Sequence, residues 1–168
     1  MDLNEFNQIP EQQAQELLRH CVQIPRWTQD IVFTRPFTSL EDLLDYAKKQ
    51  ALTWTWDEVL TALNNHPRIG EKKAQASLTE QEREFSNREQ SAIKQSSEIE
   101  DALLKGNMAY EKKFGFIFLI RALGLDHSEI LQALKYRLLN DVETEQRIVK
   151  QQLSEIAILR LTQALSEH

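Results

Sequence analysis

The chain contains a single cysteine, Cys21, so no disulfide bond can form within it. Disulfide bonds are rare in reducing compartments, and this composition therefore fits a cytoplasmic protein. A lone cysteine can act as a nucleophile, but free cysteines are among the most buried residue types, and we expect Cys21 to be a packing residue. The polar and acidic N-terminal residues do not have the pattern of a signal peptide.

Long apolar runs and blocks of like charge are also missing. The longest apolar run, 116–120, is far too short to cross a bilayer, so we expect no membrane partner. The net charge is -6, and acidic and basic residues are mixed along all 168 positions. This pattern argues against nucleic acid as a partner and against a helix-turn-helix regulator. It is compatible with an anionic small-molecule ligand, because the local field in a pocket matters more than net charge.

Familiar motifs for phosphate, metal and serine-hydrolase chemistry are absent as well. The sequence has no Gly-rich phosphate loop, no HExxH and no GxSxG, and its four histidines are widely scattered. We therefore expect no nucleotide or metal site of a recognised kind.

Proline and glycine are scarce, with four of each, and no proline follows position 67. Long helices can therefore run through the C-terminal part of the chain. We expect one all-α domain over residues 1–168, a compact bundle of about eight helices without an internal repeat or linker. The expected helices are 10–22, 39–51, 56–64, 86–95, 97–113, 116–123, 127–139 and 142–165.

Several helix starts are marked by a capping residue with Glu three positions later, at Thr38, Thr55 and Asp126. Pro10 suits the first turn of a helix. The segment 32–34 could be extended, but three residues form no sheet.

His66 follows a helical pattern that ends on Asn64 and Asn65. Pro67 restricts His66 to an extended backbone, so the imidazole sits on a short, stiff segment. A histidine titrates near neutral pH and suits proton transfer. The alternative is a loop histidine beside a helix end, without a catalytic role.

Two copies of one pattern follow, Ser77-x-x-Glu80-Gln81 and Ser86-x-x-Glu89-Gln90. Each copy can be a capping box at a helix start. The free N–H groups of a helix N-terminus also attract anions, so either copy could hold a small polar molecule. The spacing alone does not distinguish the two copies.

Arg160 lies on a helix face that should be buried. On a helical wheel it falls about 20° from Val149, between Leu153 and Ile156. A buried cation needs a partner, because an unpaired buried charge is costly. Arg160 therefore extends to solvent, forms a structural ion pair, or meets an anion in a pocket.

An aromatic run surrounds Gly115, with Phe114, Phe116 and Phe118. Such a run is typical of a core. The glycine suggests a close backbone approach or a change of direction. A helix beginning at 116–118 would leave N–H groups available to a ligand.

Six segments resemble those of one family: RPF at 35–37, HPRIG at 66–70, SNREQSAI at 86–93, NMAYEKKFGFIFLI at 107–120, RLLN at 137–140 and ILRL at 158–161. Together and in this order they resemble the signatures of OHCU decarboxylase, where OHCU is 2-oxo-4-hydroxy-4-carboxy-5-ureidoimidazoline. The resemblance covers nearly the whole chain, and its specificity comes from the combination of motifs.

The resemblance implies a carboxy-lyase that forms (S)-allantoin in the last step from urate. It also implies an all-α fold, no cofactor, a small-molecule substrate and a homodimer. Some relatives have a proline after the second Phe of FGFIF, but a backbone contact survives that change. The chain does not end in the peroxisomal tripeptide of some eukaryotic members, which favours a cytoplasmic, bacterial-type enzyme.

The resemblance also assigns the site. Its catalytic residues are His66, Glu89 and Arg160. Its substrate-binding residues are Pro67, Ser86, Asn87, Arg88, Gln90, Phe118, Leu119, Ile120, Arg121 and Ala122. The later SxxEQ copy is chosen because QSAI matches the family's small and apolar continuation, and because its distance from His66 fits better.

Glu89 has two interpretations under this resemblance. It either orients His66 and raises its basicity, or crowds the substrate carboxylate and favours loss of carbon dioxide. Two other functions stay open. The chain could be a non-enzymatic all-α interaction module, or a decarboxylase of a related hydroxy or oxo acid.

Overall fold

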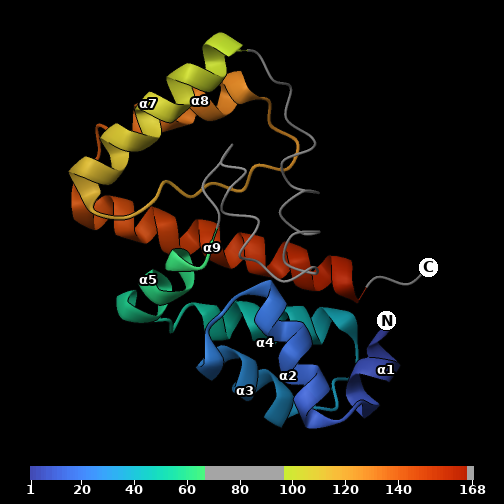
Figure 1. Cartoon of the computed structure of the whole chain (residues 1–168). Coiled ribbons are helices and arrows are strands. Elements are labelled where there is room, and N and C mark those ends of the chain that lie inside the picture. Colours follow the sequence, from blue (N-terminus) through green and yellow to red (C-terminus); the bar gives the residue numbers. More distant parts are fainter. Residues whose placement is uncertain (67–96, 166–168) are drawn as a thin grey trace. The chain divides into compact units, whose positions relative to one another are not determined.

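The computed structural model describes residues 1–66 and 97–165 (Figure 1). Within these ranges the chain forms eight α-helices and no β-strand, which confirms the all-α prediction. The helices are α1 (Leu3–Gln8), α2 (Glu11–Cys21), α3 (Pro25–Thr34), α4 (Leu40–Ala51), α5 (Trp56–Asn64), α7 (Ser97–Phe114), α8 (His127–Arg137) and α9 (Val142–Ala164). The helix predicted at 86–95 lies outside the described residues.

The chain divides into two units. Unit 1 comprises Met1–Ala62 and Ser154–His168, and unit 2 comprises Leu63–Leu153. Helices α5 and α9 contribute residues to both units. The single domain over 1–168 stays a prediction.

In unit 1, α3 packs against both α2 and α4 (Figure 1). Trp27 of α3 is buried, and its indole N–H donates to the Ala47 carbonyl of α4 (3.0 Å). Its ring also meets Trp54 edge to face, with the centroids 6.1 Å apart. The side chains of Trp27 and Trp54 are therefore part of the core beside the α3–α4 contact.

The prediction of an extended segment at 32–34 is wrong, because α3 includes these residues. Pro25 stands at the first position of this helix, where its missing N–H costs nothing. Trp27, Ile31 and Val32 then fall on one buried face. This helical spacing was overlooked at the sequence level, as was the short helix α1.

The RPF segment anchors α1. Arg35 donates from Nη1 to the carbonyl oxygens of Phe6 (2.8 Å) and Ile9 (2.9 Å). The Asn7 side chain bonds the N–H and the carbonyl of Phe37 (2.9 and 3.0 Å). The Arg35–Pro36 peptide bond is cis. These contacts give the RPF motif a structural role within unit 1.

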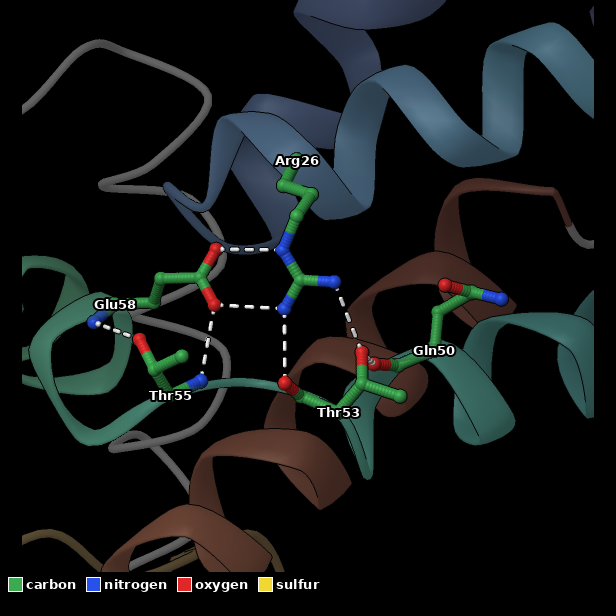
Figure 2. Close-up of polar contacts among 5 residues, drawn as sticks. All are labelled: Arg26, Gln50, Thr53, Thr55 and Glu58. Carbon is green, nitrogen blue, oxygen red and sulfur yellow. Dashed lines mark hydrogen bonds and ion pairs between the residues drawn. The ribbon is translucent and has the colours of Figure 1, made fainter.

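An ion pair joins the start of α3 to the start of α5. Arg26 donates from Nε to Glu58 Oε2 (3.0 Å) and from Nη2 to Glu58 Oε1 (2.7 Å). It also donates to the hydroxyl and carbonyl oxygens of Thr53 (3.0 and 2.9 Å), as Figure 2 shows. Glu58 in turn accepts from the Thr55 N–H (2.9 Å), and its own N–H donates to the Thr55 hydroxyl (3.2 Å). The cluster confirms the capping box predicted at Thr55.

Loss of the Arg26 guanidinium should cost a modest amount of stability. The side chain is 43% exposed, and exposed pairs contribute about 0.2–1 kcal/mol. We expect Arg26→Met to lower the free energy of unfolding at neutral pH by about 1 kcal/mol, because a two-point contact lies at the upper end of that range. Denaturant unfolding measures this difference. Arg19→Met is the matched control, since its looser pair with Glu16 (3.7 Å) should contribute nothing measurable.

The same cluster predicts a pH dependence. The hydrogen bond from Arg26 is the main reason that the pKa of Glu58 lies below its ordinary value of 4.5. A lowered folded-state pKa gives stability that is complete above the unfolded pKa and is lost as pH falls through the folded one. The difference between wild type and Arg26→Met should therefore shrink below about pH 4.5. A constant difference down to the acid transition would contradict this assignment.

In unit 2, α7 and α8 lie side by side (Figure 1). A Cβ added at Gly106 of α7 would come within 2.5 Å of Leu134 Cδ2, so the glycine permits this close approach. Tyr110 of α7 is buried between the rings of Phe114, Phe116 and Phe118, at centroid distances of 4.6 to 5.9 Å. The aromatic run is therefore core, as predicted.

The helix predicted at 116–123 is wrong. Gly115, with φ of 83°, ends α7, and its N–H donates to the Glu111 carbonyl (2.8 Å). Residues 117–122 then form an irregular segment without helix or strand. The apolar run looked helical because no breaker interrupts it before Gly124. The change of direction predicted at Gly115 is confirmed, whereas the free helix start is not.

The remaining helix boundaries agree closely with the prediction. Asp126 caps α8 in a reciprocal capping box with Glu129. The cap of α4 is Ser39, rather than the predicted Thr38. Pro10 stands just before α2 instead of in its first turn. Among the residues that the structure describes, no helix has the length and apolar character needed to cross a membrane.

Candidate functional site

His66 stands two residues after the last residue of α5. The helix ends at Asn64, as the two asparagines predicted, and the His66 N–H donates to the Leu63 carbonyl (2.9 Å). The residue is partly buried. The backbone of His66 is thus attached to the last turn of α5, and its side chain keeps some access to solvent.

The segment Phe118–Ala122 has two fixed points. Arg137 donates from Nη1 to the Leu119 carbonyl (2.6 Å), and the Arg121 N–H donates to the Gln152 side-chain oxygen (2.8 Å). The guanidinium of Arg137 also lies over the Phe118 ring, 4.5 Å from its centroid. Side chains from α8 and α9 therefore hold an irregular backbone segment in place.

Several backbone donors of this segment make no hydrogen bond within the part of the chain that the structure describes. Within residues 1–66 and 97–165, the N–H groups of Phe118, Ile120 and Ala122 donate no hydrogen bond. Backbone N–H groups of folded proteins are nearly always paired with protein, water or ligand. These groups are suited to binding the carbonyl or amide edge of a small polar molecule.

Arg160 belongs to unit 1 and is buried, with 6% of its surface exposed. The predicted burial of this cation is confirmed, and extension of its side chain to solvent is excluded. Its Nη1 lies 3.5 Å from the Cys21 carbonyl oxygen, a long contact.

Cys21 is a packing residue, as expected. It is buried, and burial raises the pKa of its thiol to about 12, although the positive charge of Arg160 opposes this shift. The thiol therefore stays protonated at neutral pH and is a poor nucleophile.

The predicted site residues are only partly described. His66 and Phe118–Ala122 belong to unit 2, whereas Arg160 belongs to unit 1. The other predicted residues lie outside the described residues: Pro67, Ser86, Asn87, Arg88, Glu89 and Gln90. Their roles, and those of both SxxEQ copies, stay predictions.

The sequence reasoning missed the buried charges of unit 2. Arg137 is 7% exposed and Glu145 is fully buried. With about 100° per residue, Arg137 falls about 20° from Ile130 and shares the apolar stripe of α8 with Leu134. Glu145 falls about 40° from Val149 on α9. The wheel that drew attention to Arg160 would therefore have found both residues.

In the part of the chain that the structure describes, no group of three or more His, Cys, Asp or Glu side chains is arranged to hold a metal ion.

Comparison with known proteins gives the family. The family model for OHCU decarboxylase matches residues 7–162. The chain belongs to the OHCU decarboxylase family. The matched range includes His66, the Phe118–Ala122 segment and Arg160.

Other members of the OHCU decarboxylase family are similar along most of the chain. The mouse 2-oxo-4-hydroxy-4-carboxy-5-ureidoimidazoline decarboxylase is 33% identical over 148 residues, which cover 84% of this chain and 77% of the mouse protein. The uric acid degradation bifunctional protein TTL of Arabidopsis thaliana is 30% identical over 158 residues. That match covers 88% of this chain but 46% of the plant protein, so the chain spans less than half of this relative.

A solved structure supports the same family. The chain resembles a crystal structure of OHCU decarboxylase in the presence of (S)-allantoin, with a TM-score of 0.71 and 28% identity. The match covers 88% of this chain and 95% of the solved one.

Proposed function

We propose that this protein is a carboxy-lyase that converts OHCU to (S)-allantoin and carbon dioxide in urate degradation. The observation that carries the proposal is the family match over residues 7–162, which spans the predicted site. The similarity to an OHCU decarboxylase crystallised in the presence of (S)-allantoin supports the same reaction. It also supports one family domain over the whole chain.

The substrate carries its carboxylate on C4, which also bears a hydroxyl and adjoins C5, the carbon of a ring C=N group that is conjugated with the 2-oxo group. When the bond to the carboxylate breaks, carbon dioxide leaves and its electron pair forms a C4=C5 double bond, while the electrons of the C=N group pass to the ring nitrogen and the 2-oxo group as an enolate-like anion. On protonation at C5, the 4-hydroxyl group loses its proton and becomes the ring carbonyl of allantoin. The ring thus accepts the electrons itself, and the reaction needs no cofactor. A proton delivered to one face of the planar intermediate gives the (S) product.

His66 performs the proton work in this proposal. It bonds the 4-hydroxyl group and supports formation of the planar intermediate, as a general acid and base. The attachment of its backbone to the end of α5 supports this role, because it fixes the position from which the imidazole acts. Glu89 either orients His66 or crowds the departing carboxylate.

The other residues bind and orient the substrate. Arg160, a buried cation, binds the anionic substrate or stabilises the enolate oxygen. The N–H groups of Phe118, Ile120 and Ala122 hold the ring edge. Five further substrate contacts come from Pro67, Ser86, Asn87, Arg88 and Gln90.

We also propose a cytoplasmic homodimer without a nucleic-acid partner. The single, buried cysteine fits a reducing compartment, and the mixed charge pattern offers no basic surface for nucleic acid. The dimer is supported by the family resemblance and by large apolar side chains exposed on α7, Leu104 (62%) and Met108 (65%).

The direct test measures turnover of OHCU produced in the cuvette by urate oxidase and hydroxyisourate hydrolase. We expect the protein to accelerate OHCU decay well beyond its spontaneous rate. Weak turnover of OHCU with rapid turnover of another hydroxy or oxo acid would identify a related decarboxylase. If the protein accelerates the decay of neither OHCU nor any such acid, the interaction-module hypothesis is favoured.

A further inference from the structure

The buried cation Arg137 contacts other groups besides its counter-ion, Glu145. It donates from Nε to Glu145 Oε1 (2.6 Å), and its Nη2 lies in an ion pair with the same oxygen (2.5 Å). Its remaining terminal nitrogen, Nη1, donates to the Leu119 carbonyl (2.6 Å), and its plane covers the Phe118 ring. The guanidinium thus joins an acidic residue of α9 to the backbone of the Phe118–Ala122 segment.

Glu145 fixes the orientation of Arg137. Its carboxylate also accepts from the Tyr110 hydroxyl (2.6 Å) and from the Asn140 side-chain amide (3.0 Å). Burial, together with the hydrogen bond to Glu145, raises the pKa of Tyr110, so its hydroxyl stays a donor at neutral pH. A carboxylate with several fixed donors holds its Arg partner in one geometry.

A second contact fixes the other end of the segment. The Gln152 side chain accepts from the Arg121 N–H (2.8 Å), two residues after Leu119. One contact is therefore made to a carbonyl and the other to an N–H. Between and beside them lie the N–H groups of Phe118, Ile120 and Ala122, which make no hydrogen bond within the described ranges 1–66 and 97–165.

Stability alone is a weak explanation for this arrangement. Replacing a buried ion pair by well-packed apolar residues is often neutral or stabilising. An apolar pair would, however, leave the Leu119 carbonyl without its donor and the segment without its fixed conformation. Unlike an apolar core, the charged cluster therefore fixes the conformation of the irregular Phe118–Ala122 backbone.

We propose that Arg137 and Gln152 are positioning residues that hold Phe118–Ala122 in the conformation in which its free N–H groups bind the substrate ring, with Glu145 orienting Arg137. This inference rests on the proposed decarboxylase function. Neither residue touches the substrate, and each acts through the backbone segment.

The test compares Gln152→Met, which removes the acceptor, with Gln152→Glu, which keeps an oxygen at the same position. Contacts made equally to the bound substrate and the transition state affect KM rather than kcat. We expect Gln152→Met to raise KM for OHCU about tenfold with kcat nearly unchanged, and Gln152→Glu to restore most of this loss. Arg137→Lys keeps the charge but loses the planar fork, and should raise KM at least as much.

A merely structural role predicts a different result. Partial unfolding removes active molecules, which lowers apparent kcat and leaves KM unchanged. Arg26→Met is the matched control, because it breaks an Arg–Glu contact of unit 1 and should leave KM unchanged. Unchanged KM in both Gln152→Met and Arg137→Lys would overturn the proposal.

Amide hydrogen exchange gives a readout that does not depend on the reaction. We expect Gln152→Met and Arg137→Lys to accelerate exchange in peptides covering 116–123 more than in those from α7 and α8. If the wild-type protein does not turn over OHCU, the proposed function is refuted. The exchange pattern would still test whether Arg137 and Gln152 position the segment. If exchange in the variants is accelerated evenly over unit 2, or is not accelerated at all, the positioning role is overturned.

Discussion

Replacement of His66 by alanine is expected to lower kcat for OHCU by about 10²- to 10⁴-fold, the usual contribution of general acid–base catalysis. His66 is partly buried, and its backbone is bonded to the last turn of α5. Because alanine removes the imidazole and leaves the backbone able to make the same bond, the fold should be preserved. The comparison requires kcat, KM and the free energy of unfolding for both proteins.

His168→Ala is the control for the His66 variant. This histidine lies outside the range 7–162 that matches the family, so its loss should leave kcat unchanged. The interaction-module hypothesis predicts that His66→Ala also changes no activity. A loss of kcat below about threefold in a fully folded His66→Ala protein would remove His66 from the proton chemistry.

Replacement of Arg160 by methionine is expected to lower kcat/KM for OHCU by about 10- to 150-fold. A hydrogen bond to a charged group is worth about 1.5–3 kcal/mol, and the proposed substrate is an anion. Arg160 is buried on the stripe of α9 that includes Ile156 and Ala157, so a ligand would meet it away from bulk water. Steady-state kinetics over a range of OHCU concentrations measure the effect.

The kinetics also separate the two roles proposed for Arg160. A higher KM with unchanged kcat would assign it to ground-state binding, whereas an equal fall in kcat and kcat/KM would assign it to the enolate. Arg160→Lys should recover part of the loss, because the charge is kept without the two-point geometry. Arg19→Met on the exposed face of α2 is the control. If Arg160→Met leaves kcat/KM unchanged but greatly lowers the free energy of unfolding, Arg160 has a structural role in an ion pair.

Much of the fold follows from local signals. Capping residues with their paired glutamates mark the starts of α5 and α8, and the asparagines after α5 mark its end. The proline-free sequence after position 67 allows α9 to run for 23 residues. These features were predictable because each depends on residues within one or two turns of each other.

The errors have a common physical origin. The run after Gly115 has the composition of a buried helix, yet two of its backbone groups are paired with Arg137 and Gln152, which are distant in sequence. Tertiary partners of this kind override local preference and cannot be deduced from spacing. The helix α3 was missed for a different reason, since the β-branched and aromatic residues at 32–34 suggested a short extended segment.

The parts of the site that could be predicted from the sequence are those whose residue types stand out from their surroundings. Arg160 was found because a cation on an apolar stripe is conspicuous, and its burial is confirmed. Arg137 and Glu145 obey the same rule, since each lies on the apolar stripe of its helix. Their pairing joins α8 to α9 and needs the folded backbone to be seen. The roles of His66 and Glu89 came from the family resemblance and stay predictions.

The central claim, that this protein decarboxylates OHCU stereospecifically, is tested most directly by the optical activity of the allantoin formed. OHCU would be generated from urate in the presence of wild type, His66→Ala or no added protein, and circular dichroism followed over time. The account predicts rapid appearance of (S)-allantoin with wild type, and racemic allantoin at the spontaneous rate in the other two samples. Racemic product at the spontaneous rate with wild type would contradict it.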